Sequence, residues 1–347
     1  MAKGKLFLLL VVLVVVFAGL VLLKGIMDSD GDWLSSLFSG GDNNSGGWGF
    51  DLGDFGGLLG GGLNLGGGGK TIISTNNNTE LGSVAGYIQW VKDDELIFSG
   101  ASEYGNSIWA IKTNGSNLRD LTKNTGDFRQ EFTKKWDFSF GYKGGASPEY
   151  NESTGKVVYY AFEKQEIGDN YHYLETVDFS GENIEVFAII EGADPSQGFQ
   201  ISPNGKYMYV AGGHLTELKE GTKYYGPEKV FDGWGAKFTK DSKTIMYRND
   251  NGFYSYNIAN DKSEFLADLD CYYSDYCEKD NTVICTISTE AICSPFVLYD
   301  LKTGTKKKDL GCDFNPSSLA FSADCSKVAY RSYNHTEGEM VKLLNVS

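Results

Sequence analysis

Three histidines, His172, His214 and His335, are the side chains of this chain whose ordinary pKa suits a general base near neutral pH. Nucleophilic catalysis needs such a base beside a Ser or Cys side chain. His335 lies inside an N-glycosylation sequon, and His172 lies between two tyrosines in a segment expected to form a strand. His214 follows Gly212-Gly213 and is the one histidine expected at the rim of a fold. No Gly-x-Ser-x-Gly elbow occurs, so the sequence predicts a protein that is not an enzyme and has no catalytic residues.

Asp28, Asp30 and Asp32 are the candidate metal ligands, because they alternate along the chain as the carboxylates of calcium loops do. Trp33 stands where such loops have their turn glycine, and Ser39 stands where they have their last glutamate. An acidic, solvated spacer is therefore the alternative interpretation of these three residues.

Neither a cofactor nor a nucleic-acid partner is expected. The tract 64–71 has the glycines and the Lys-Thr pair of a phosphate-binding loop, but Asn64 stands where the first glycine belongs. The chain has 46 acidic and 31 basic residues and a formal net charge of −15. A surface of that sign repels phosphate backbones.

Six cysteines cluster in the last quarter of the chain, and an even number in an exported protein indicates disulfides. Pairing of Cys285 with Cys293 across a hairpin is the first expectation, and Cys271–Cys312 and Cys277–Cys325 would then join neighbouring repeats. The connectivity stays open, and a metal site or free buried thiols are the alternatives. The predicted disulfide cysteines are Cys271, Cys277, Cys285, Cys293, Cys312 and Cys325.

Sequons for N-glycosylation fit an exported surface and would have no meaning in the cytosol. The candidate acceptors are Asn43, Asn77, Asn114, Asn151, Asn334 and Asn345.

An apolar run of 18 residues, Leu6 to Leu23, is long enough to cross a membrane as a helix. Lysines precede it and acidic residues follow it, which favours an N-in orientation with the rest of the protein outside the cell. We expect residues 1–27 to be an uncleaved, single-pass signal anchor in the cell membrane. A cleavable signal peptide ending near Ala18 is the alternative.

Residues 28–69 form an acidic and then Gly-rich linker. About half of the tract 39–69 is glycine, which loses more conformational entropy on ordering than any other residue. We expect a flexible tether. Trp48, Phe50 and Phe55 punctuate the tract, so packing on a membrane, on the folded domain or on one another is the alternative.

The elements that would position any site come from a phrase that recurs six times. Each copy has an apolar stretch, a tight polar turn and a β-rich stretch, most clearly in Gln200-Ile-Ser-Pro-Asn-Gly-Lys-Tyr-Met-Tyr-Val210. The turns recur at a mean spacing of about 46 residues. A period in the forties with several short strands per unit is typical of a β-propeller blade. The other turns lie near Asp94, Thr154, Asp241, Asp280 and Asp324.

The fold class is therefore all-β, a six-bladed β-propeller over residues 70–347. The last repeat stops after what would be its third strand, and the β-prone segment 71–75 stands alone before the first repeat. We expect residues 70–76 to supply the missing outer strand and close the ring. The aromatic-rich stretch 127–143 fits no strand position, which leaves seven blades as an alternative.

The segment Ile108-Trp-Ala-Ile-Lys-Thr-Asn-Gly-Ser-Asn-Leu-Arg-Asp-Leu-Thr122, together with Ile201-Ser-Pro-Asn-Gly-Lys206, resembles the TolB-type six-bladed propeller repeat. The resemblance covers residues 70–347 as a repeat pattern. It implies an exported ring that binds proteins or small ligands at one end of its central channel. The repeat is also similar to the propeller of prolyl-oligopeptidase-like peptidases, whose chemistry resides in a separate domain, so no catalytic residues carry over. The α/β domain of TolB itself is not recognisable in this sequence.

The sequence thus predicts a membrane-tethered extracellular propeller that binds a protein partner or a small ligand without catalysing a reaction. One alternative is a structural subunit of a surface layer or filament, with self-assembly through the Gly-aromatic tract. The other is a propeller hydrolase or lyase with its site in the central channel. Acidic or His side chains clustered at one channel mouth would favour the enzyme, and an apolar face would favour partner binding.

Overall fold

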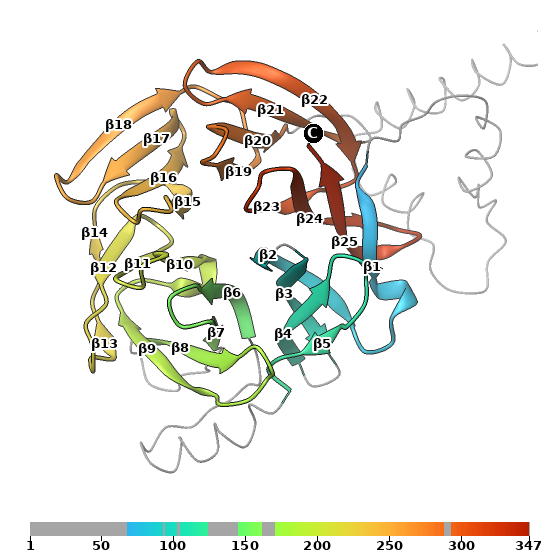
Figure 1. Ribbon diagram of the computed structural model, residues 1–347, viewed down its shortest axis with the longest axis horizontal. Helices are drawn as coiled ribbons and strands as arrows, with labels where there is room; N and C mark the ends of the chain where they lie inside the picture. Colours follow the sequence, from blue (N-terminus) through green and yellow to red (C-terminus); the bar gives the residue numbers. More distant parts are fainter. Residues whose placement is uncertain are drawn as a thin grey trace, which may run out of the picture. The chain divides into compact units, whose positions relative to one another are not determined.

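The computed structural model describes residues 68–92, 94–102, 105–123, 145–161, 171–287 and 293–346. These residues form six sheets arranged as the blades of a ring (Figure 1). The fold is an all-β, six-bladed propeller, so the seven-bladed alternative is wrong. Within the described residues the helical elements are two short 3-10 turns, η1 (Thr75–Asn77) and η2 (Pro195–Gln197).

Each blade is an antiparallel sheet whose strands follow one another from the ring centre outward. In that order, blade one has β2 (Ser83–Lys92), β3 (Glu95–Ser102), β4 (Gly105–Lys112) and β5 (Arg119–Asp120). Blade two has β6 (Gly145–Asn151), β7 (Lys156–Ala161), β8 (Tyr171–Asp178) and β9 (Glu185–Glu191). Blade three has β10 (Phe199–Ile201), β11 (Tyr207–Val210), β12 (His214–Glu217) and β14 (Glu228–Lys229). β13 (Tyr224–Tyr225) leaves blade three and pairs in parallel with β9 of blade two.

Blade four has β15 (Trp234–Phe238), β16 (Thr244–Asn249), β17 (Gly252–Asn257) and β18 (Lys262–Ala267). Blade five has β19 (Tyr273–Cys277), β20 (Thr282–Thr286), β21 (Ser294–Asp300) and β22 (Thr305–Asp313). Blade six has β23 (Ser317–Phe321), β24 (Lys327–Asn334), β25 (Gly338–Asn345) and, as its outer strand, β1 (Lys70–Ser74).

The polar turn of the repeat has the same construction in three blades. In blade three Asn204 Oδ1 accepts hydrogen bonds from the Ser202 hydroxyl at 2.8 Å and from Lys206 N at 3.0 Å. Asp241 and Asp324 accept the equivalent pair of bonds in blades four and six. These bonds to the charged form lower the pKa of both aspartates. A short oxygen acceptor two residues after a hydroxyl is thus the local reason that the phrase folds as a tight turn.

The hydrophobic cores lie between neighbouring blades. Val157, Tyr159 and Val177 of blade two pack with Ile97 and Ile108 of blade one, all fully buried. Equivalent clusters join the other blades, so each sheet buries both of its faces. This packing explains why the middle strands are continuous apolar runs, because strands covered on both faces have no solvent side on which polar residues alternate.

The ring is closed by strands from opposite ends of the described chain. β1 pairs antiparallel with β25 in the register Lys70↔Leu343 to Ser74↔Met340. Closure was expected from residues 70–76, of which the first five form β1 and the last two belong to the turn η1. Blade six therefore has one strand from before blade one and three from the end of the chain.

Several predictions from the sequence fall outside the described residues. They are the apolar run 6–23, Asp28, Asp30 and Asp32, the acceptor Asn43, and the linker 28–69 apart from its last two glycines. Within the described part of the chain, no helix is long and apolar enough to cross a membrane.

Candidate functional site

One position of the inner strands is polar in five of the six blades, and we call these residues together with the sixth the belt. In blades one, three, four and six the belt position is flanked on both sides by residues that pack into the inter-blade cores, as Phe199 and Ile201 do in β10. Its members are Gln89, Glu149, Gln200, Lys237, Asp275 and Ala320.

The belt hydrogen-bonds each blade to the next around the ring. Gln89 Oε1 accepts from the backbone N–H of Tyr150 at 2.6 Å, and Gln200 Oε1 accepts from Phe238 N at 3.3 Å. Glu149 accepts from the N–H of Ile201. Between blades six and one, where Ala320 has no polar side chain, the Trp90 indole donates to the Ala320 carbonyl at 2.8 Å.

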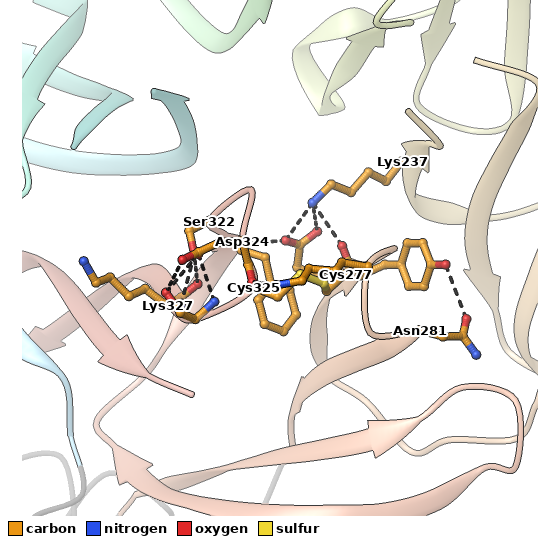
Figure 2. The surroundings of a disulfide bond; sticks show 12 residues. Lys237, Cys277, Asn281, Ser322, Asp324, Cys325 and Lys327 are labelled. Atoms are coloured by element: carbon orange, nitrogen blue, oxygen red, sulfur yellow. Dashed lines mark hydrogen bonds and ion pairs between the residues drawn. A yellow bond between two sulfur atoms is a disulfide. The ribbon is translucent and has the colours of Figure 1, made fainter. Parts of the chain in front are cut away.

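Lys237 and Asp275 carry the belt across blades four, five and six (Figure 2). Lys237 Nζ donates to both carboxylate oxygens of Asp275 at 2.9 Å and to the Tyr276 carbonyl at 3.2 Å. Asp275 in turn accepts from Phe321 N at 2.6 Å. The ion pair is largely shielded, since the Asp275 side chain is 12% exposed. The same blades five and six are joined covalently by Cys277–Cys325.

Glu149 is the belt residue with the most perturbed ionisation. Burial raises the pKa of its carboxyl from 4.5 to about 8, although the bonds from Gln89 and Ile201 and the charge of Lys237 act in the opposite direction. Glu149 is therefore mostly protonated at neutral pH. A raised carboxyl pKa is a common mark of functional sites, but a structural hydrogen-bond network produces it too.

Four belt side chains accept from the backbone N–H of the residue after the next belt position. The inner strands therefore run in one direction and begin at one face, which we call the entry face. Two residues before the belt position, the backbone is left-handed in five blades. The register with the second strand shifts at this point in blades one, two, four and six, as β-bulges do. The left-handed residues are Tyr87, Ser147, Gly198, Gly235 and Ser318.

Tyr87 is unusual because a bulky side chain rarely tolerates a φ of 51°. Its N–H donates to the Ser318 hydroxyl of blade six at 3.0 Å. Its own hydroxyl donates to the Ser196 carbonyl in η2 at 3.1 Å. The side chain therefore reaches from blade one to the connection between blades two and three. Strained residues of this kind often belong to functional sites.

The entry face also carries most of the exposed large apolar side chains among the described residues. Four of the seven lie at the start of an inner strand or within three residues before it, and Tyr87 lies in β2 two residues before the belt position. We call these five the entry-face aromatics. They are Tyr87 (39% exposed), Trp234 (42%), Tyr272 (58%), Tyr273 (40%) and Phe314 (42%). The remaining two, Phe265 and Tyr224, lie in the outer strands β18 and β13.

Two arginines at equivalent positions of blades four and six fix the backbone beneath these aromatics. Arg248 donates to the carbonyls of Cys271 and Tyr272, and its guanidinium lies 5.4 Å from the Trp234 ring centre. Arg331 donates to Val84 O at 2.6 Å and forms an ion pair with Glu339. Each arginine thus links its blade to the next at the entry face.

The histidines are not brought together. His172 in β8 contacts the Tyr160 hydroxyl at 3.2 Å and lies 3.7 Å from Asp194, and burial lowers its pKa. His335 contacts Tyr333 in the turn between β24 and β25. His214, expected at the rim, lies within β12 with its Nδ1 buried and without a hydrogen-bond partner among the described residues. The contacts of His172 and His335 are thus with tyrosines and an aspartate rather than with a Ser or Cys nucleophile.

All six cysteines form disulfides, but only one of the expected pairs is present. Cys277–Cys325 joins blades five and six as expected. The expected Cys285–Cys293 and Cys271–Cys312 pairs are wrong, because the bonds are Cys271–Cys285 and Cys293–Cys312. In β20 and β21, Cys285 lies opposite Val297 and is thus four residues out of register with Cys293. The cluster of Cys277, Cys325 and Asp280 holds no free thiolate for a metal.

The described sequons differ in accessibility. Asn77, Asn114 and Asn345 are exposed, and Asn334 is half-buried in a turn. Asn151 is 3% exposed, and its side-chain oxygen accepts from Ser153 N and Oγ. The folded ring therefore leaves no room for a glycan on Asn151.

Solved structures similar to this chain include two TolB proteins and a lyase. TolB from Acinetobacter baumannii has 15% sequence identity and a TM-score of 0.52, over 73% of this chain and 64% of that one. A putative TolB from Agrobacterium tumefaciens has 12% identity over 66% and 81%, with a TM-score of 0.46. An oligogalacturonate lyase in complex with manganese has 10% identity over 74% and 86%, with a TM-score of 0.42.

No protein-family model and no curated protein sequence matches the chain. The chain spans less than two thirds of the A. baumannii TolB structure. At these identities the likeness shows the fold, which agrees with the TolB-type repeat inferred from the sequence.

Sequence reasoning did not identify the belt or the entry-face aromatics. A signal for the belt was present, because four of the repeats have one polar residue between two apolar ones just before the turn, as in Phe199-Gln-Ile201. The entry-face aromatics stand at or ahead of the repeated phrase, and only superposition of the six blades brings them to one face.

Proposed function

We propose that this chain is a non-catalytic, membrane-tethered extracellular propeller that binds a protein partner through the entry-face aromatics. The observation that carries the proposal is the gathering of Trp234, Tyr272, Tyr273 and Phe314 at one face of blades four to six, with Tyr87 on the innermost strand of blade one. Exposed aromatic residues and arginine are the residue types that dominate the energetics of protein interfaces.

The geometry suits a preorganised binding surface. Arg248 holds the carbonyls before β19 and lies against the Trp234 ring, so the two aromatic positions are fixed relative to each other before a partner arrives. A surface fixed in advance loses less conformational entropy on binding. The belt beneath keeps the inner strands in place.

The tether and the location rest on the sequence. The apolar run 6–23 with its lysines before and acidic residues after supports an N-in anchor in the cell membrane. The exposed acceptors Asn77, Asn114 and Asn345 would carry the glycans. Three disulfides suit an oxidising compartment.

A photo-crosslinking experiment tests the proposed face. The full-length chain is expressed in its source cells with p-benzoylphenylalanine in place of Trp234 or Tyr272, and in matched controls in place of Phe265 or Tyr224, which are exposed to a similar degree. We expect crosslinks to one partner at the first two positions only. Crosslinks of equal yield at all four, or only at the controls, would contradict the proposal.

Once the partner is known, truncation of one aromatic gives the energetic test. Trp234→Ala should weaken binding by roughly 2 kcal/mol, about thirtyfold, as for an interface hot spot. Phe265→Ala is the control and should leave the affinity unchanged. Equal losses for both, measured by calorimetry with an unchanged melting temperature, would show that the binding surface lies elsewhere.

A further inference from the structure

The attachment of β1 depends on a buried polar group that we call the latch, formed by Asp313, Tyr330, Lys342 and the backbone N–H of Gly69. The Tyr330 hydroxyl donates to Asp313 Oδ2 at 2.6 Å and accepts from Gly69 N at 2.6 Å. Lys342 Nζ donates to the same carboxylate at 3.0 Å. Asp313 and Lys342 are 5% and 8% exposed, so the pair is shielded from water.

The latch joins three segments that are distant in sequence. Asp313 is the last residue of β22 in blade five, Tyr330 and Lys342 belong to β24 and β25 of blade six, and Gly69 directly precedes β1. Burial and the Asp313 carboxylate raise the pKa of Tyr330, so its hydroxyl keeps the proton that it donates. Blade five therefore holds the start of β1 through one tyrosine of blade six.

The two glycines before β1 are fitted to this contact. A Cβ on Gly69 would lie 2.2 Å from the Leu343 carbonyl oxygen, and a Cβ on Gly68 would lie 3.0 Å from Asp313 Oδ2. At the other end of β1, Asn76 reaches the exposed Thr336 carbonyl at 2.8 Å. The buried Ser74 hydroxyl donates to the Glu337 carbonyl at that end as well, so the latch is the attachment of the first residues of β1.

A disulfide fixes the position of Asp313. Cys312 is its neighbour in the chain, and the Cys293–Cys312 bond ties the end of β22 to the start of β21, where Cys312 lies opposite Pro295 and Asp313 lies opposite Ser294. Without this bond the last residues of β22 are held by their pairing with β21 and by the contacts of Asp313 with Tyr330 and Lys342. If Asp313 leaves, Lys342 becomes a buried charge without its partner, which is strongly unfavourable.

We propose that the Cys293–Cys312 disulfide and Asp313 form a redox-controlled latch that holds β1 on blade six. A dithiol reductant delivers two electrons and two protons to the Cys293–Cys312 bond, which yields two thiols and converts the reductant to a disulfide. The end of β22 then loosens, Asp313 withdraws from Tyr330 and Lys342, and β1 opens from β25. The oxidation state therefore controls whether β1 stays paired with β25.

Hydrogen exchange of the amides of residues 70–74 in the full-length chain tests the latch. Cys293→Ser with Cys312→Ser removes this disulfide alone, and Cys271→Ser with Cys285→Ser removes the other disulfide of blade five as a matched control. We expect exchange in β1 to become at least tenfold faster in the first variant and to stay unchanged in the second. Amides of β10 and β11 in blade three should not change in either.

Asp313→Asn, with every disulfide intact, should reproduce the fast exchange of β1. Equal acceleration in both cysteine variants would mean general loosening of blade five, and unchanged exchange in the first variant would mean that the disulfide does not control β1. Both outcomes overturn the proposal.

If a cysteine variant fails to fold, wild-type protein titrated with a dithiol provides the same test. Thiol labelling reports which bond has opened, and exchange in β1 must then follow the labelling of Cys293 rather than that of Cys271. Exchange that follows Cys271, or neither cysteine, also overturns the proposal.

Discussion

At the scale of single residues, Glu149 shows how the ring holds polar groups at its inner strands. Its carboxyl is buried, and its partners, Gln89 and the N–H of Ile201, favour the charged form without offsetting the loss of hydration. Lys237, whose charge also favours the carboxylate, is already paired with Asp275. The protonated form is therefore favoured in the folded state.

This proton makes stability depend on pH. The pKa of Glu149 is about 8 in the folded state and 4.5 as the ordinary value, so between these pH values the folded state binds more protons than the unfolded state. The free energy of unfolding must then fall as the pH rises, by up to about 1.4 kcal/mol per pH unit. The stabilisation is complete below pH 4.5 and is lost as the pH rises through 8.

Glu149→Gln removes the titration while keeping an acceptor for Ile201. We expect the variant to be more stable than the wild type at pH 8 and to have a flatter dependence on pH between 6 and 8, as measured by urea unfolding. Glu182→Gln, an exposed residue of the same blade that does not act on the pKa of Glu149, is the control and should keep the wild-type slope. An unchanged slope in Glu149→Gln would show that another group takes up the proton.

At the scale of elements, β1 tests whether closure of blade six stabilises the whole ring. Gly69→Ala forces a Cβ against the Leu343 backbone, and the start of β1 must move. We expect a loss of roughly 2 kcal/mol, or a fall in the melting temperature of about 4 °C. Gly82→Ala is the matched control, since its Cβ would lie 3.6 Å from the nearest atom, and it should have little effect. A neutral Gly69→Ala would mean that β1 contributes little to the ring.

The repeat and its closing element were predictable because both follow from local chemistry. The turn needs a hydroxyl and a short oxygen acceptor at fixed spacing, as in Ser202 and Asn204, and this pattern is visible without neighbours. The segment 71–75 is β-prone and the last repeat lacks a strand. The pairing of β1 with β25 could therefore be predicted by counting the strands of each blade.

The disulfide pairing and the candidate site were not predictable, because both depend on register and on contacts between blades. Cys285 and Cys293 are only eight positions apart in the sequence, yet the strands pair Cys285 with Val297. Trp234 and Phe314 are 80 positions apart in the sequence, and their shared face follows only from the common direction of the inner strands. The residues of the repeat serve the fold, so the repeat does not identify a ligand or partner.

At the scale of the whole molecule, a ring resists opening only as well as its weakest interface. Blades five and six are joined by the bond from Phe321 N to Asp275 and by Cys277–Cys325 (Figure 2). This disulfide closes a loop of sequence separation 48, whereas Cys271–Cys285 closes one of 14. In the chain-entropy model the longer loop stabilises by about 1 kcal/mol more.

The two disulfides should therefore differ when each is removed alone. Cys277→Ser with Cys325→Ser should lower the free energy of unfolding by about 1 kcal/mol more than Cys271→Ser with Cys285→Ser, as measured by guanidinium unfolding without reductant. It also removes the covalent link between two blades, so it should accelerate hydrogen exchange on both sides of that interface, in β19 and in β23. The second variant cuts a link within blade five and should leave β23 protected. If the second variant were the less stable of the two, hydrogen bonds and packing, rather than the Cys277–Cys325 disulfide, would hold blades five and six together.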